Sequence, residues 1–148
     1  MDWVYLFNEF HGRIGRKTFW MAIAVLAVAE TVGHFIAGEL QGERLGAIID
    51  LAFIYPEFAV AIKRAHDRNL PLWLLGIFFA ASAGLDFLGV LNLFAVPDVT
   101  TSEEAPNMLL LGIAVPFTVL GIALLVELGF RRGTVGPNQY GPDPLAKV

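Results

Sequence analysis

The sequence contains no cysteine. Disulfides, thiolate zinc sites, iron–sulfur clusters and cysteine nucleophiles are therefore excluded together. Charged residues are also scarce, at 16% of the chain, whereas a typical soluble domain has about 25%. Apolar residues make up 56% of the 148 residues, which is more than a soluble domain of this size would bury. We therefore expect lipid to be the solvent for much of this chain.

Several motifs that would indicate a function are absent as well. We find no phosphate-binding glycine loop, no Gly-x-Ser-x-Gly elbow and no metalloprotease helix motif. No basic patch with interleaved aromatic residues indicates a nucleic-acid partner. The two halves of the chain do not resemble each other, so an inverted-repeat transporter is not indicated.

What the sequence does contain is four long apolar stretches. A helix needs about 20 mainly apolar residues to cross the hydrocarbon core. The predicted spans cover residues 18–38, 45–62, 70–96 and 108–130. Asn69 followed by Pro71 is typical of a helix start and should open the third span. The expected fold is all-α: a four-helix transmembrane bundle forming one multi-pass domain over residues 1–148.

The basic residues indicate a direction for these spans. Of the ten lysines and arginines, all but Arg44 lie before the first span, between the second and third, or after the fourth. This alternation follows the positive-inside rule, so both termini and the loop at 63–69 are predicted to be cytoplasmic. Trp3, Trp20 and Trp73 agree, since each falls near the cytoplasmic boundary.

The N-terminal segment "MDWVYLFNEF" predicts a short helix lying in the membrane interface. Trp3, Leu6, Phe7 and Phe10 would share one apolar face of this helix. A docking segment for another subunit is the alternative interpretation.

The C-terminal tail, residues 131–148, contains "GTVGPNQYGPDP", which is too rich in glycine and proline to be helical. It could be disordered, but we favour an ordered, turn-rich cytoplasmic cap. Asn138 and Asp143 suit turns, and Tyr140 could anchor at the headgroups. Asp143 could pair with Arg13, Arg16 or Arg64.

Three motifs in this order resemble the DUF805 family of small bacterial inner-membrane proteins, which includes the YhaH-like proteins. They are "GRIGRKTFW" at 12–20, "KRAHD" at 63–67 after Pro56, and "GTVGPNQYGPDP" at 133–144. The resemblance covers nearly the whole chain. It implies a multi-pass helical protein of the bacterial inner membrane, with its motifs on the cytoplasmic face and no established activity.

We predict that the three motifs form one cytoplasmic cluster. Its members would be Arg13, Arg16, Lys17, Lys63, Arg64, His66, Asp67, Asn138, Tyr140 and Asp143. Asp67 should meet Lys63 at i,i+4 and Arg64 at i,i+3 on a helix end, and the cations could also reach lipid phosphates.

A metal site at the adjacent pair His66 and Asp67 is not favoured. Neighbouring residues on a helix point about 100° apart, and the only other histidines are His11 and His34. We therefore predict no metal, no cofactor and no catalytic residue.

A second group of polar residues lies within the predicted spans: Glu30, His34, Asp50, Glu57 and Asp86. Ionisable groups there are costly and usually face the bundle interior or water. They could form an ion or proton path, or they could be buried contacts that orient the helices. A path would require an oligomer, because four short spans leave little room for a pore.

The leading hypothesis is a non-enzymatic scaffold or accessory subunit that binds anionic lipid headgroups or a larger membrane complex. The alternative is a small oligomeric transporter or channel using the intramembrane carboxylates. A third possibility is a membrane enzyme acting at the cytoplasmic cluster.

Overall fold

The computed structural model describes residues 2–40, 43–91 and 108–146. Within these ranges all regular secondary structure is helical, and the one β feature is an isolated bridge between Asn138 and Gly141. The all-α prediction is confirmed. The helices are α1 (Trp3–Asn8), α2 (Arg16–Glu39), α3 (Glu43–Arg68), α4 (Trp73–Val90) and α5 (Met108–Gly129).

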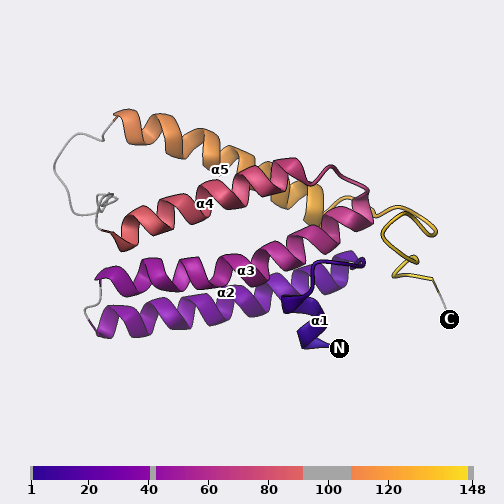
Figure 1. The fold of residues 1–148 in the computed structure, drawn as a ribbon, viewed down its shortest axis with the longest axis horizontal. Helices are drawn as coiled ribbons and strands as arrows, with labels where there is room; N and C mark the ends of the chain where they lie inside the picture. Colours follow the sequence, from indigo (N-terminus) through magenta and orange to yellow (C-terminus); the bar gives the residue numbers. More distant parts are fainter. Residues whose placement is uncertain (1, 41–42, 92–107, 147–148) are drawn as a thin grey trace.

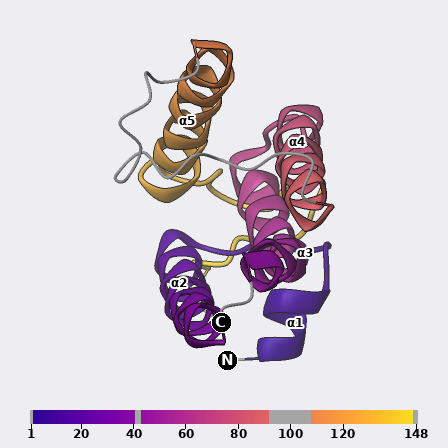
Figure 2. The same ribbon diagram turned by 90° about the vertical axis from the view of Figure 1, so that its left-hand side faces the viewer.

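The four long helices run alternately in opposite directions (Figure 1). At one end α2 and α4 begin and α3 and α5 end, and α1 and the C-terminal tail lie at the same end. We call this the motif end, because all three sequence motifs are found there. Seen along the bundle, α3 occupies the middle and contacts each of the other helices (Figure 2).

The boundaries of the helices follow from local chemistry. The Asp2 carboxylate caps α1 by accepting the Tyr5 amide at 3.1 Å. At the end of α3, Asn69 adopts a left-handed conformation with a φ of 55°. The Asn69 and Leu70 amides donate to the His66 and Ala65 carbonyls at 3.1 and 3.0 Å, which is the Schellman arrangement. The prediction that Asn69 opens the next helix is therefore wrong, since this residue terminates α3.

The hydrophobic core gathers towards the motif end. Its buried members are Leu6, Ile14, Phe19, Ala22, Leu26, Val60, Ala61, Ala65, Leu75, Leu124 and Leu128. Ala22 on α2 and Ala65 on α3 are fully buried, and small buried residues allow helices to approach closely in membrane bundles. On the other side, α4 meets α5 through stacked Phe78 and Phe117 rings with centroids 4.6 Å apart.

Three of the described helices are long and apolar enough to cross a membrane: Arg16–Glu39, Arg44–Arg68 and Gly112–Gly129. The apolar stretch of α4, Trp73–Leu88, is shorter. The third predicted span covers 70–96, but α4 begins only at Trp73, because the Schellman turn occupies the residues before it. Its last residues, 92–96, lie outside the described part of the chain.

Only part of the apolar face predicted for the N-terminal helix is buried. Leu6 is 1% exposed and belongs to the core, whereas Trp3 is 50% exposed and stacks on Phe7. Thus α1 docks against α3 through Leu6. Whether its exposed face also lies in a membrane interface stays a prediction.

Candidate functional site

A buried carboxylate stands at the centre of the motif end. Asp67 Oδ1 accepts hydrogen bonds from Arg13 Nη2 at 2.9 Å and Nε at 3.2 Å. The other oxygen, Oδ2, pairs with Arg64 Nη1. All three residues are buried, with Arg64 fully so. Two guanidinium groups therefore share one carboxylate in a place that water does not reach.

The remaining donors of the two arginines bind backbone carbonyls at the chain's C-terminal end. Arg13 donates to Thr134 O at 2.6 Å, Gly136 O at 2.8 Å and Gly141 O at 3.1 Å. Arg64 donates to Leu128 O, near the end of α5, at 2.6 Å and to Arg131 O, just beyond α5, at 2.5 Å. These bonds use the forked geometry of arginine. They tie the tail to the segment before α2 and the end of α5 to α3.

Lys63 does not form the predicted i,i+4 pair with Asp67. Its side chain is buried and donates to Tyr5 O at 2.9 Å and to Glu9 O. The ammonium thus satisfies carbonyls at the end of α1, which would otherwise lack partners. Burial raises the pKa of the Tyr5 hydroxyl above its ordinary value, so this hydroxyl keeps the proton that it donates to the Arg13 carbonyl at 3.4 Å.

His66 lies between the first motif and the tail. Its Nδ1 is 3.0 Å from Gly12 O, and its ring stacks on Tyr140 with centroids 3.8 Å apart. Asn138 Nδ2 donates to the His66 carbonyl at 2.9 Å. His66, Asn138 and Tyr140 therefore make structural contacts that join all three motifs.

The tail is held by its own turns as well. Thr134 donates to Asp67 O through both its amide, at 2.7 Å, and its hydroxyl, at 2.9 Å. Asp143 accepts the Leu145 and Gly136 amides at 2.9 Å each. These amides lower the pKa of the Asp143 carboxyl. The predicted ion pair between Asp143 and an arginine is wrong, because Asp67 takes Arg13 and Arg64 while Asp143 serves the tail backbone.

Two glycines in the motifs were missed as structural positions. Gly12 has a φ of +87°, a conformation that other residues rarely adopt, and a side chain there would strike the Tyr5 hydroxyl. Gly133 lies directly against the Asp67 carboxylate, leaving no room for a Cβ atom. The repeated glycines of the motifs were the available signal, but the sequence did not show which glycines face a neighbouring side chain.

A different set of cations remains exposed around the motif end: Arg16, Lys17, Arg131 and Arg132. Lys17 lines a cavity of about 360 Å³ whose walls include Leu6 and Leu145. Glu127 pairs with Arg131 at 3.0 Å and with Arg68 at 2.5 Å. The basic residues of the motif end thus include a buried group, Arg13, Lys63 and Arg64, and half-buried Arg68. The other four are exposed, and two of them also bond within the chain: Arg131 with Glu127, and Arg16 with Phe130 O at 3.2 Å.

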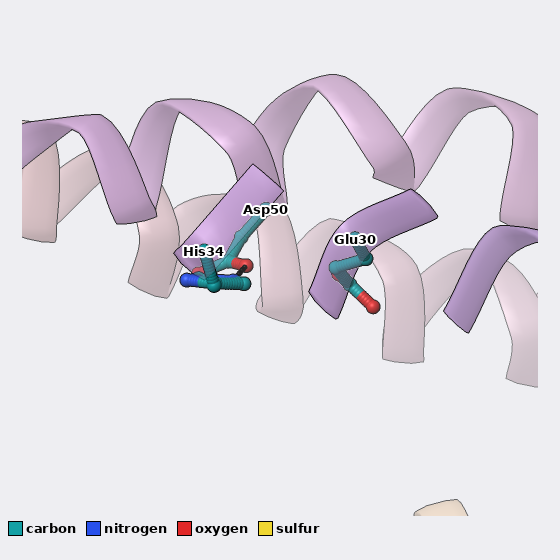
Figure 3. A group of neighbouring side chains, drawn as sticks. All are labelled: Glu30, His34 and Asp50. Atoms are coloured by element: carbon teal, nitrogen blue, oxygen red, sulfur yellow. Dashed lines mark hydrogen bonds and ion pairs between the residues drawn. The ribbon is translucent and has the colours of Figure 1, made fainter. Parts of the chain in front are cut away.

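The polar residues predicted to lie within the spans form a second group, away from the Asp67 cluster. His34 Nε2 is 2.6 Å from Asp50 Oδ1, which links α2 to α3, and Glu30 lies one turn before His34 on α2 (Figure 3). Glu57 on α3 and Asp86 on α4 interact electrostatically with Glu30 and Asp50. The structure therefore brings Glu30, His34 and Asp50 together, and Glu57 and Asp86 lie close enough to interact with them electrostatically.

The geometry of the motif end indicates its chemistry. The polar atoms of Arg13, Arg64 and Asp67 are already engaged with one another or with backbone carbonyls. His66 is occupied by Gly12 and Tyr140. Bonds of this kind fix three chain segments in place, and they leave the exposed cations as the groups able to meet an external anion.

Comparison with known proteins gives a family. Residues 7–142 match the family model DUF805, described as a protein of unknown function. The chain is 31% identical over 146 residues to the uncharacterized protein YiiR of Escherichia coli K12, covering 96% of this chain and 88% of that one. It is 26% identical over 155 residues to the inner membrane protein YhaH of the same strain, covering 97% of each. No solved structure matches.

Proposed function

The chain belongs to the DUF805 family, and from this premise we propose that it is a four-span, non-enzymatic inner-membrane protein whose cytoplasmic end binds anionic lipid headgroups. The observation that carries the proposal is the division of the cations. Arg13, Lys63 and Arg64 are buried and bonded within the chain. A second set lies at the same end and is exposed: Arg16, Lys17, Arg131 and Arg132. The relative named as an inner membrane protein supports the location.

The connectivity supports a fourth span. The ends of α3 and α5 are joined directly, since Arg64 donates to Leu128 O at 2.6 Å. The chain must therefore return to the opposite end between them, and α4 is the helix that runs that way (Figure 1). Its 18 residues extend over roughly 27 Å, close to the hydrocarbon thickness of about 30 Å.

Single-cysteine variants test this topology, because the chain has no cysteine of its own. Leu40→Cys and Leu91→Cys, at the ends of α2 and α4, should react with a membrane-impermeant maleimide in intact spheroplasts. Gln139→Cys in the tail should react only after permeabilisation. Labelling of Leu40→Cys but not of Leu91→Cys in intact spheroplasts would contradict the fourth span. Labelling of Gln139→Cys in intact spheroplasts, with Leu40→Cys and Leu91→Cys protected, would show the opposite orientation.

Lipid binding follows from charge and from the neighbouring aromatic residues. Exposed Trp3 and Trp73 both lie at the motif end, at 50% and 64% exposure, and indole rings prefer the headgroup region. Each lysine or arginine near an anionic surface adds about 1 kcal/mol of attraction. Lys17, beside the cavity against Leu6 and Leu145, combines a cationic group with an apolar wall, which suits a phospholipid.

The test measures lipid selectivity by quenching of tryptophan fluorescence with brominated lipids. In phosphatidylcholine vesicles, brominated phosphatidylglycerol should quench more than brominated phosphatidylcholine. Neutralising the exposed cations should weaken this preference about tenfold or more. The variant is Arg16→Gln/Lys17→Gln/Arg131→Gln/Arg132→Gln.

The matched control keeps every charge: Arg16→Lys/Lys17→Arg/Arg131→Lys/Arg132→Lys. It should retain the selectivity of the unmodified protein. Equal selectivity in the neutralised variant and the control would contradict headgroup binding. Copurification of a large membrane protein in fixed ratio, in mild detergent, would instead assign the chain the role of an accessory subunit.

A further inference from the structure

The face shared by α2 and α3, away from the motif end, carries three potential metal ligands of two chemical kinds. An imidazole, His34, lies with two carboxylates, Glu30 and Asp50, and one ligand atom from each is within 4.8 Å of the others. We propose that these three residues form a binding site for a divalent transition-metal ion of the Zn²⁺ type. This inference is independent of lipid binding at the opposite end.

The helices position these ligands. Glu30 and His34 are four residues apart on α2 and share a face, and Asp50 approaches them from the antiparallel helix α3. Close packing holds the pair, because Gly33 on α2 lies against Ile49 and Gly46 on α3 lies against the His34 ring. A Cβ atom at Gly46 would be 3.4 Å from His34 Nδ1. The ring therefore stays beside α3, with Nε2 directed towards Asp50.

The distances suit a small divalent cation. Zn²⁺ binds imidazole nitrogen and carboxylate oxygen at about 2.0–2.2 Å, so tetrahedral ligand atoms lie roughly 3.3 Å apart. His34 Nε2 and Asp50 Oδ1 are already 2.6 Å apart, and a metal would replace the hydrogen bond between them. The Glu30 carboxylate, now within 4.8 Å of the other ligand atoms, has to approach them by up to about 1.5 Å, which a rotation of its side chain can supply.

The electrostatic surroundings favour a cation. Ionised carboxylates within an apolar span are costly unless a positive charge compensates them. The carboxylates of Glu57 and Asp86 interact electrostatically with those of Glu30 and Asp50. Four carboxylates therefore stand against a single imidazole in this region. A divalent ion bound by Glu30 and Asp50 would offset this concentration of negative charge.

Protein does not close off the site, and one coordination position remains for water. The His34 side chain is 44% exposed and that of Asp50 is 35% exposed. His34 lies five residues before the end of α2 at Glu39, or about 7.5 Å along the helix, which is near the membrane surface. Three protein ligands leave the fourth position for water, as in open zinc sites. Mixed imidazole and carboxylate ligands select zinc or its neighbours over calcium and magnesium.

The experiment uses the full chain without a histidine tag, purified in mild detergent and stripped with a chelator. Zn²⁺ affinity is measured by competition with a chromophoric chelator, and Co²⁺ is added as a spectroscopic probe. We expect one ion per chain, with visible Co²⁺ bands of a nitrogen- and oxygen-ligated site. His34→Ala, Asp50→Asn and Glu30→Gln should each weaken Zn²⁺ binding at least tenfold.

The control is His11→Ala, which removes a histidine that is paired with Glu9 at the motif end and should leave Zn²⁺ affinity unchanged. Asp50→Asn and Glu30→Gln keep the size of the side chains, so they test the site even if His34→Ala fails to fold. Failure of the unmodified protein to bind Zn²⁺ or Co²⁺ in a fixed ratio would overturn the proposal. Unchanged affinity in the His34 or Asp50 variant, or an equal loss in His11→Ala, would overturn it too.

Discussion

Asp67→Asn should cost about 3–5 kcal/mol of unfolding free energy, the usual loss when one partner of a buried ion pair is removed. Asp67 is 3% exposed, and its two oxygens are shared between Arg13 and Arg64. An asparagine leaves two buried guanidinium groups facing each other without a compensating negative charge. Unfolding in a series of SDS and mild-detergent mixtures measures this loss directly.

The same substitution should release the tail. Thr134 is bound to the Asp67 backbone and Arg13 holds three tail carbonyls, so a displaced Arg13 loosens the whole segment. Limited trypsin digestion at Arg132 should then become faster than in the unmodified protein.

The control for Asp67 is Glu127→Gln. Glu127 also pairs with two arginines, Arg68 and Arg131, but its side chain is 23% exposed. Because this pair is partly exposed, water screens it in part, and the expected loss is smaller than that for Asp67. Equal losses for the two substitutions would show that burial does not decide the contribution of the Asp67 cluster.

Gly133→Ala should destabilise the protein by about 1–3 kcal/mol, as overpacking of a filled interior does. The new methyl group would lie 2.5 Å from Asp67 Cγ and 2.8 Å from Oδ1. The carboxylate cannot move aside without breaking its bonds to Arg13 and Arg64. Unfolding free energy and tail digestion are the measurements, as for Asp67.

A glycine in open space supplies the matched control. At Gly84 in α4, no atom lies within 4 Å of an added Cβ atom, and alanine is favoured over glycine in helices by up to about 1 kcal/mol. Gly84→Ala should therefore be neutral or stabilising. A loss at Gly84 as large as that at Gly133 would mean that the contact with Asp67 is not the cause.

The motif-end cluster shows how far local pattern reasoning reaches. The i,i+3 spacing of Arg64 and Asp67 predicts an ion pair, and the structure has it. The same reasoning fails for Lys63, because the end of α1 presents unpaired carbonyls that the sequence does not place beside this side chain. It fails for Asn69 too, since an asparagine suits either end of a helix and only the backbone conformation distinguishes the two.

By itself the sequence determined the helical class of the chain, its long apolar helices, its family, and the three motifs whose glycines, cations and prolines mark one end. Composition and helical periodicity are enough for the helical class and the long apolar helices, because they depend on neighbours within a few residues. The family follows from the three motifs and their order along the chain. Only the tertiary structure decided the partners. Arg13 meets Asp67 across 54 positions and Thr134 across 121, and Asp50 meets His34 from another helix. Such contacts join residues that are far apart in the sequence. Which of the possible partners meet depends on how the helices pack, and local sequence does not specify that packing.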